Sequence, residues 1–236
     1  MNQITDELLR IISSFKDGTF QGAYNIREDG QCAGRQSTKN VKIESKTDVP
    51  GLDIRILPGT RGESVSIPAC VTHGDVDDLV YNDFYVGQDA DVTIVAGCGV
   101  HTENGEPARH NGIHRFFLEK GAKVKYLEKH IGTGEGGGIR SIDPVTEAVL
   151  AENAVLEMDT AQIGGVDQST RKTKATLAAG ARLLIRERIL TERDQVAKTL
   201  FEVEMNGEGA GTDLISRSVA RGSSRQSYRS VIIGNA

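Results

Sequence analysis

The sequence predicts an all-β protein, a right-handed parallel β-helix with a short N-terminal helix. Three observations predict it: a repeat of 27 to 32 residues, period-two alternation within the repeats, and no long helical pattern between them. The composition agrees. A chain of 236 residues with 38% hydrophobic residues can bury a core, and 27 glycines without tryptophan suit short strands and tight turns.

The repeat consists of five segments that align without gaps over fourteen residues. Each has a short strand, a polar or glycine-containing corner, a small residue and a second strand. The segments begin at Asp83, Arg115, Glu147, Lys174 and Glu202, with a degenerate unit at Asp53 and a sixth start at Arg229. Each repeat is then one coil, stacked about 4.8 Å above the last.

Regularly spaced short strands also suit a β-sandwich, which is the structural alternative. The small residue at each corner, such as Ala90 and Ala122, favours the solenoid. The opening stretch "MNQITDELLRIISSF" has apolar residues at helical spacing and predicts an amphipathic helix that packs against the β-helix or caps one end. We therefore divide the chain into an N-terminal helix and lead-in segment, 1–50, and a β-helix core, 51–236.

Charge and hydropathy narrow the possible partners. The net charge is −5 and no basic run occurs, so nucleic acid is not an expected partner. No stretch approaches the roughly 18 apolar residues of a membrane span, and the polar start is unlike a signal peptide. Three scattered cysteines are too few for a disulfide framework, so we expect a cytoplasmic protein with no membrane insertion.

Cysteine and histidine gather in "AGCGVHTENGEPARHNGIH", residues 96–114. Cys98 and His101 form a C-x2-H motif that repeats Cys70 and His73 at the coil period, and His130 follows one period later. Stacking by this motif would align the cysteines with each other and the histidines with each other. Stacking by the strand alignment would instead place Cys98 level with His130 and Gln162. The sequence leaves both registers open.

Thiolate and imidazole are ligands for zinc and for iron–sulfur clusters. We therefore take Cys98, His101 and His130 as candidate metal ligands on neighbouring coils. His110 and His114 are weaker candidates, expected on a connecting loop. Gly97 and Gly99 flank Cys98 and are expected to leave its sulfur unhindered. The alternative is an inert cysteine, since a buried cysteine often behaves as a small hydrophobe.

Other motifs carry no chemistry. "GTGEGGG" at 132–138 contains G-x-G-x-x-G, but "IRSIDP" follows it rather than a helix, so a dinucleotide site is not expected. Neither G-x-x-x-x-G-K-[ST] nor G-x-S-x-G occurs. We expect no enzymatic activity of the chain itself.

Several stretches resemble the SufB/SufD family of iron–sulfur cluster assembly scaffolds. They are "GCGVH", "RHNGIHRFF", "AKVKYLEKHIGTGEG", "MDTAQIGGVDQSTRKTKATL", "NGEGAGTDLISRSVA" and "YRSVIIGNA". The resemblance covers nearly the whole chain. It implies a right-handed β-helix, a transient iron–sulfur cluster, a SufC-type ABC ATPase that hydrolyses ATP as the partner subunit, and a homodimer or a heterodimer with a related subunit.

The sequence departs from this family after "GNA". Family members typically continue into a segment with a ligand cysteine and then a helical region that docks on SufC. We therefore expect the C-terminal part of the family to be missing here. Such an ending would leave the apolar stretch from Val231 to Ile233 near an open coil edge, where self-association is expected.

Two other function classes compete with the scaffold. One is a metal-free β-solenoid that acts as an interaction module through its open coil edges. The other is a β-helical carbohydrate enzyme, which needs paired carboxylates and aromatic platforms. Only 5% of the residues are aromatic, which speaks against the enzyme.

Overall fold

The computed structural model describes residues 1–13, 15–16 and 18–235, with one helix, α1 (Gln3–Ile12), and two facing sheets. In spatial order, one sheet contains β16 (Gly211–Ala220), β14 (Arg182–Thr191), β12 (Val155–Gln162), β9 (Lys123–Thr133), β7 (Asp91–His101), β5 (Arg61–Val71), β1 (Ala23–Glu28) and β2 (Gln31–Gln36). The other contains β17 (Arg225–Gly234), β15 (Val196–Met205), β13 (Gln168–Leu177), β10 (Arg140–Ile142), β8 (Ala108–Leu118), β6 (Val76–Val86), β4 (Gly51–Ile56) and β3 (Val41–Ser45), with β11 (Val145–Leu150) between β8 and β13.

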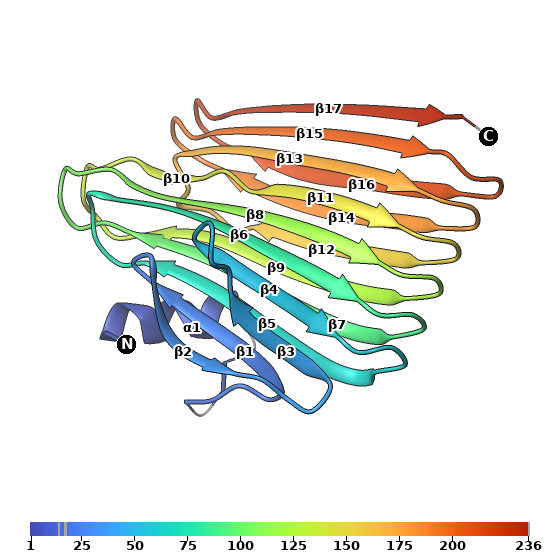
Figure 1. Cartoon of the computed structure of the whole chain (residues 1–236). Helices are drawn as coiled ribbons and strands as arrows, with labels where there is room; N and C mark the ends of the chain where they lie inside the picture. Colours follow the sequence, from blue (N-terminus) through green and yellow to red (C-terminus); the bar gives the residue numbers. More distant parts are fainter. Residues whose placement is uncertain (14, 17, 236) are drawn as a thin grey trace.

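The chain alternates between the two sheets, and each strand pairs in parallel with the strand one coil away. β7 pairs with β9, β9 with β12 and β12 with β14, all without a register shift (Figure 1). Among the named strands of the described residues, only the first hairpins, β1–β2 and β3–β4, pair antiparallel. The predicted parallel β-solenoid is confirmed and the β-sandwich alternative is wrong. The coils begin earlier than Asp53, because β1 already pairs in parallel with β5.

The repeated small residue marks the short corner between the sheets. Ala90, Ala122, Ala154 and Ala181 are fully buried there. The residue before each alanine has a positive φ, namely Asp89, Gly121, Asn153 and Gly180. Aspartate, asparagine and glycine are the residues that tolerate this backbone conformation. The corner therefore combines a left-handed turn residue with a small buried side chain.

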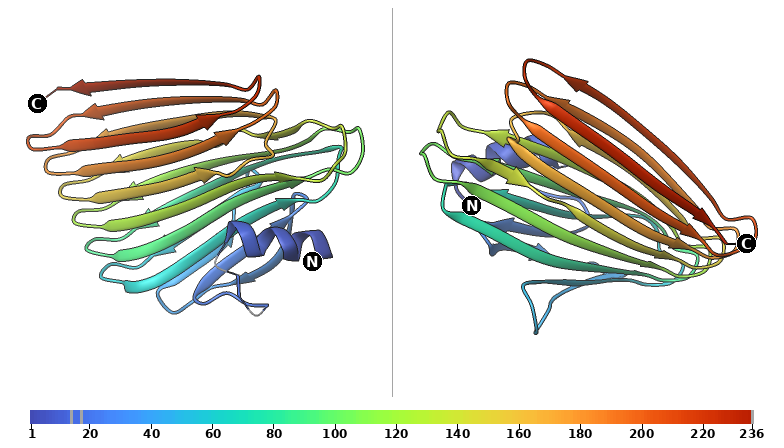
Figure 2. Two further views of the ribbon diagram at one scale, coloured as in Figure 1. Left: turned by 180° about the vertical axis from the view of Figure 1, so that it is seen from behind. Right: turned by 90° about the horizontal axis from the view of Figure 1, so that it is seen from above.

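Side chains between the sheets change in character along each strand. Near the short corner they are apolar and form the main core, where Phe84 and Phe116 stack with ring centroids 4.7 Å apart. Toward the long loops the same strands carry buried polar residues, such as Glu128 and His130 on β9. The sheets converge on the short corners and diverge toward these loops (Figure 2). The interior thus has an apolar half and a polar half.

Helix α1 lies on the outer face of the first sheet, against β5, β7 and β9 (Figure 1). The Asn2 side chain caps it by accepting a hydrogen bond from the Thr5 N–H, and its apolar stripe, Leu8, Leu9 and Ile12, is buried. The predicted helix and its packing on the solenoid are both observed. Across the described residues, no helix is long and apolar enough to cross a membrane.

The two glycines beside Cys98 serve this helix. A Cβ atom at Gly97 would collide with the carbonyl group of Ile12, and one at Gly99 would lie 2.8 Å from a methyl carbon of Leu8. The glycines let the helix approach the outer face of β7. They do not expose the sulfur of Cys98, which lies on the inner face and is buried.

Candidate functional site

Cys98 lies in the polar half of the interior, level with a histidine on the next coil. The register of β7 and β9 pairs Cys98 with His130, and that of β9 and β12 pairs His130 with Gln162. The strand alignment therefore predicts the stacking correctly. The C-x2-H motif does not, because Cys70 is paired with Gly99 and Ala69 with Cys98.

His110 and His114 come from the opposite sheet. Both lie in β8 with buried side chains, so the expectation that they lie on a loop is wrong. The polar sequence around them hid a strand, in which His110, Gly112 and His114 occupy alternate, inward positions. A cavity of about 20 Å³ is lined by Cys98 and both of these histidines. The fold thus brings one thiol and two imidazoles to one small space.

His110 is held by a buried hydrogen bond to a carboxylate. Its Nδ1 lies 3.0 Å from Oδ2 of Asp78, whose carboxylate also accepts hydrogen bonds from the Arg27 guanidinium at 2.6 to 3.0 Å. Burial alone would raise the pKa of Asp78, but the hydrogen bonds from His110 and Arg27 outweigh it and hold the pKa far below its usual value. Asp78 is therefore a carboxylate, and His110 Nδ1 is the donor.

His114 is held by a second chain of buried groups. Its Nδ1 lies 2.7 Å from the hydroxyl of Tyr126, and this hydroxyl donates to Glu128 Oε1 at 2.7 Å. The other carboxylate oxygen of Glu128 accepts from Arg171 at 2.7 Å. Burial would raise the pKa of Glu128, but the positive charge of Arg171 lowers it well below the ordinary value. Burial lowers the pKa of His114 to about 4, so its imidazole is neutral.

His130 lies behind this chain and is completely buried. Its Nδ1 is 3.3 Å from the Arg171 guanidinium, and its Nε2 is 3.3 Å from Glu128 Oε1 without the geometry of a hydrogen bond. Burial is the main reason that its pKa is lowered. Arg171 also lies 3.3 Å from Glu187, so one guanidinium separates two buried carboxylates. Charge and hydrogen bonding thus extend from His114 toward the later coils.

Cys98 itself is a protonated thiol in this state. Burial raises the pKa of its thiol well above the ordinary value, and the negative charge of Glu128 adds to the shift. A protonated thiol is a poor nucleophile and a poor metal ligand. Cys98 therefore needs a group that accepts its proton, or a bound cation, before it can act.

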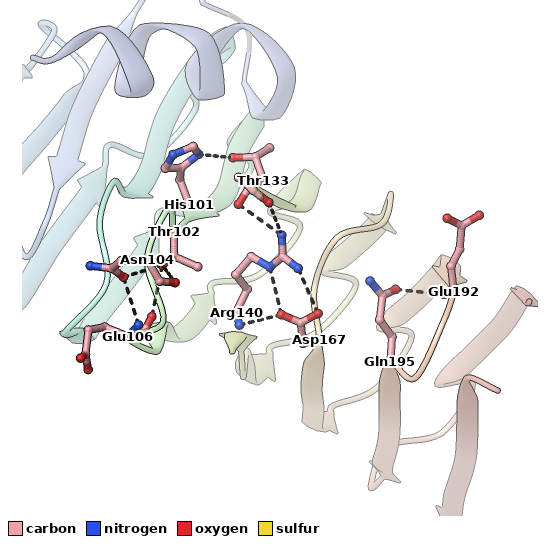
Figure 3. A network of polar contacts seen from close by, with 10 residues as sticks. His101, Thr102, Asn104, Glu106, Thr133, Arg140, Asp167, Glu192 and Gln195 are labelled. Carbon is pink, nitrogen blue, oxygen red and sulfur yellow. Dashed lines mark hydrogen bonds and ion pairs between the residues drawn. The ribbon is translucent and has the colours of Figure 1, made fainter. Parts of the chain in front are cut away.

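His101 lies apart from this cluster. Successive side chains of a strand point to opposite faces, so three residues separate Cys98 and His101 onto different sides of β7. The Nδ1 of His101 lies 2.9 Å from the hydroxyl of Thr133 (Figure 3), and its Nε2 lies 3.0 Å from Glu103. In the same view, Arg140 joins Asp167 to backbone carbonyl groups of the loop. This network stabilises the loop edge of the solenoid.

Four important residues of the cluster were missed from the sequence: Asp78, Tyr126, Glu128 and Arg171. The period-two alternation could have revealed Glu128, since it shares the parity of Tyr126 and His130. Within residues 1–13, 15–16 and 18–235, no group of three or more His, Cys, Asp or Glu side chains is arranged to hold a metal ion. The cluster is thus a buried polar interior with one thiol rather than a preformed metal centre.

The fold and this interior define a parallel β-solenoid with a thiol buried among histidines. Residues 81–235 match the family described as SUF system FeS cluster assembly, SufBD core domain. This match covers well over half of the chain, which therefore belongs to the SufBD core domain family.

Two relatives extend the comparison. An iron–sulfur cluster assembly SufBD family protein of Methanothermobacter thermautotrophicus is 24% identical over 198 residues, which cover 81% of this chain and 46% of the relative. One of Archaeoglobus fulgidus is 25% identical over 196 residues, covering 83% of this chain and 51% of the relative. The chain therefore spans about half the length of these relatives.

Proposed function

We propose that this chain is the β-helical part of a scaffold on which iron–sulfur clusters are assembled together with a SufC-type ATPase. The chain performs no ATP hydrolysis, and its role is to hold sulfide and iron, which are the substrates of assembly. Membership in the SufBD family supports a role in iron–sulfur cluster assembly. The position of Cys98 is the single observation that supports a site within this chain.

Cys98 suits this role because its surroundings can change the state of the thiol. His110 and His114 line the same cavity and can share a bound cation with the thiolate. Asp78 and Glu128 bind the outer nitrogens of these histidines directly or through Tyr126. Carboxylates behind histidines orient the imidazole rings and increase their basicity, as they do around metal sites.

The metal-free interaction module remains the rival function. A buried, protonated Cys98 and the lack of a preformed metal centre in the described residues are the observations that favour it. Under this alternative, the polar interior would only stabilise the fold, and the solenoid would act through its surface and its last coil.

The experiment is anaerobic reconstitution of the full-length protein with ferrous iron and sulfide, with and without the SufC-type ATPase. We expect visible absorption of an iron–sulfur cluster, transfer of that cluster to an apo-acceptor protein, and co-purification of the ATPase. A full-length protein that binds the ATPase but takes up neither iron nor sulfide would support the interaction module instead.

Self-association is the second part of the proposal. Among the described residues, β17 pairs with β15. The coil formed by β16 and β17 exposes large apolar side chains, namely Ile215, Val219, Tyr228, Ile232 and Ile233. Exposed apolar side chains on β-strands favour contact with a partner, and we propose a second solenoid, either an identical copy or a related subunit.

A further inference from the structure

We propose that His110, His114 and Asn82 form a seat for one molecule of hydrogen sulfide beside Cys98. The inference deepens the proposed function, on which the choice of sulfide rests. It starts from a gap in the interior that a glycine keeps open. A Cβ atom at Gly112 would lie 3.1 Å from Nε2 of His114 and 3.2 Å from Nε2 of His110. Both imidazoles therefore turn their inner nitrogens toward the same point.

The hydrogen-bond networks determine what these inner nitrogens can do. The Tyr126 hydroxyl gives its single proton to Glu128, so His114 Nδ1 must donate to the hydroxyl oxygen. Neutral His114 then carries a lone pair on Nε2. His110 Nδ1 donates to the Asp78 carboxylate, so Nε2 is its inner nitrogen. The gap is faced by the Nε2 acceptor of His114 and by Nε2 of His110.

Asn82 supplies a second acceptor. Its side chain is 5% exposed, lines the same cavity, and has an Oδ1 atom without a hydrogen-bond partner among the described residues. A buried acceptor without a donor is unfavourable. A guest that donates hydrogen bonds would relieve this cost, whereas an anion without hydrogen would increase it.

The cavity also limits the size of the guest. A volume of about 20 Å³ fits one molecule about the size of water. Hydrogen sulfide has two S–H donors, and its sulfur would lie beside Cys98, which lines the same wall. Water has the same donor pattern, so the experiment must separate the two.

The test is a sulfide titration of this chain under anaerobic conditions, followed through the histidine ring nitrogens by NMR. We expect sodium sulfide to shift the Nε2 resonances of His110 and His114. Chloride, an anion without a donor, should leave them unchanged. Gly112→Ala, whose methyl group fills the gap, should weaken the sulfide response by about tenfold or more, as expected for the loss of one good hydrogen bond.

Two further variants keep the test decisive. Asn82→Leu should also weaken the response, and it serves if Gly112→Ala does not fold. Cys98→Ser should retain the response, because the seat does not use a covalent bond to the thiol. No sulfide-dependent shift in the wild type would mean that the cavity holds water only, which overturns the proposal. Loss of the response in Cys98→Ser but not in Gly112→Ala would also overturn it.

The sulfide seat and the proposed function in cluster assembly can be disproved independently of each other. Sulfide binding is measured on this chain without iron or the ATPase, so it can succeed even if the full-length protein assembles no cluster. Conversely, cluster assembly on Cys98 can hold while the histidine resonances ignore sulfide.

Discussion

Tyr126 and His114, which belong to opposite sheets, are joined through one hydroxyl. The distance from the Tyr126 oxygen to His114 Nδ1 is 2.7 Å, and the same oxygen donates to Glu128. This contact connects the apolar half of the interior to the polar half. It also leaves Nε2 as the inner nitrogen of His114, on the side of Gly112.

Tyr126→Phe removes this hydroxyl and keeps the ring volume. It leaves the His114 N–H and one Glu128 oxygen without their partner, so we expect the free energy of unfolding to fall by about 1–3 kcal/mol. Urea unfolding measures the loss. Tyr85→Phe is the matched control, since the Tyr85 hydroxyl makes only a 3.5 Å contact with Asp83, and it should change stability by about 0.5 kcal/mol or less. Equal stabilities of the two variants would contradict the role of the Tyr126 hydroxyl.

Arg171→Met should lower the free energy of unfolding more than Tyr126→Phe does. The guanidinium lies between Glu128 and Glu187, and its loss leaves two buried carboxylates without a cation. We expect a loss of about 3–5 kcal/mol in the free energy of unfolding. Arg186→Met, which removes an exposed ion pair with Glu157, should cost about 0–1 kcal/mol. A small effect of Arg171→Met would mean that water reaches this interior freely.

Stability should fall as the pH falls from 6.5 to about 4. The pKa of His114 is lowered by burial from 6.5 to about 4, so the unfolded chain binds a proton more readily than the folded chain across this range. The loss from this residue is on the order of 3 kcal/mol. His114→Gln should flatten the pH dependence. If the free energy of unfolding of His114→Gln depends on pH as steeply as that of the wild type, a neutral, buried His114 is contradicted.

The glycines of β7 give a prediction about the helix. Gly97→Ala should push α1 away from the sheet, because the new methyl group collides with the Ile12 carbonyl. We expect a loss of about 1–3 kcal/mol, as for other overpacking changes, and faster hydrogen exchange in α1. Gly105→Ala is the control, because a Cβ atom there meets nothing within 4 Å. Unchanged exchange in Gly97→Ala would show that the helix does not depend on this close approach.

Association through the last coil can be tested on the surface. Ile233→Lys places a charge on the exposed apolar strand β17 and should shift the chain toward the monomer in sedimentation experiments. Val149→Lys changes an equally exposed side chain on β11, away from the last coil, and should leave association unchanged. A wild-type chain that is monomeric at high concentration would contradict the predicted self-association.

The sequence was most informative where the repeat was regular. Gap-free alignment of the strands predicted that Cys98 and His130 are level, since parallel strands without bulges keep their register. The alignment also located the corners at Ala90 and Ala122. The first hairpins were harder to predict, because β1 to β4 do not follow the repeat.

The site was only partly predictable for two physical reasons. The spacing of Cys98 and His101 suggested one site, although an odd spacing in a strand places two side chains on opposite faces. The polarity of the segment around His110 and His114 suggested a loop, because inward positions of a solenoid are expected to be apolar. Ion pairs such as Arg171 with Glu128 join different coils, and no single segment of sequence reveals them.

The most direct test of the account is the amount of iron and acid-labile sulfide bound by the full-length protein after anaerobic reconstitution, compared between wild type, Cys98→Ser and Cys32→Ser. Cys32 is an exposed thiol, so its variant controls for nonspecific binding by a surface cysteine. The account predicts that Cys98→Ser loses most of the bound iron and sulfide, while Cys32→Ser keeps them. Equal loading of all three proteins would contradict a role for Cys98 in holding iron or sulfide.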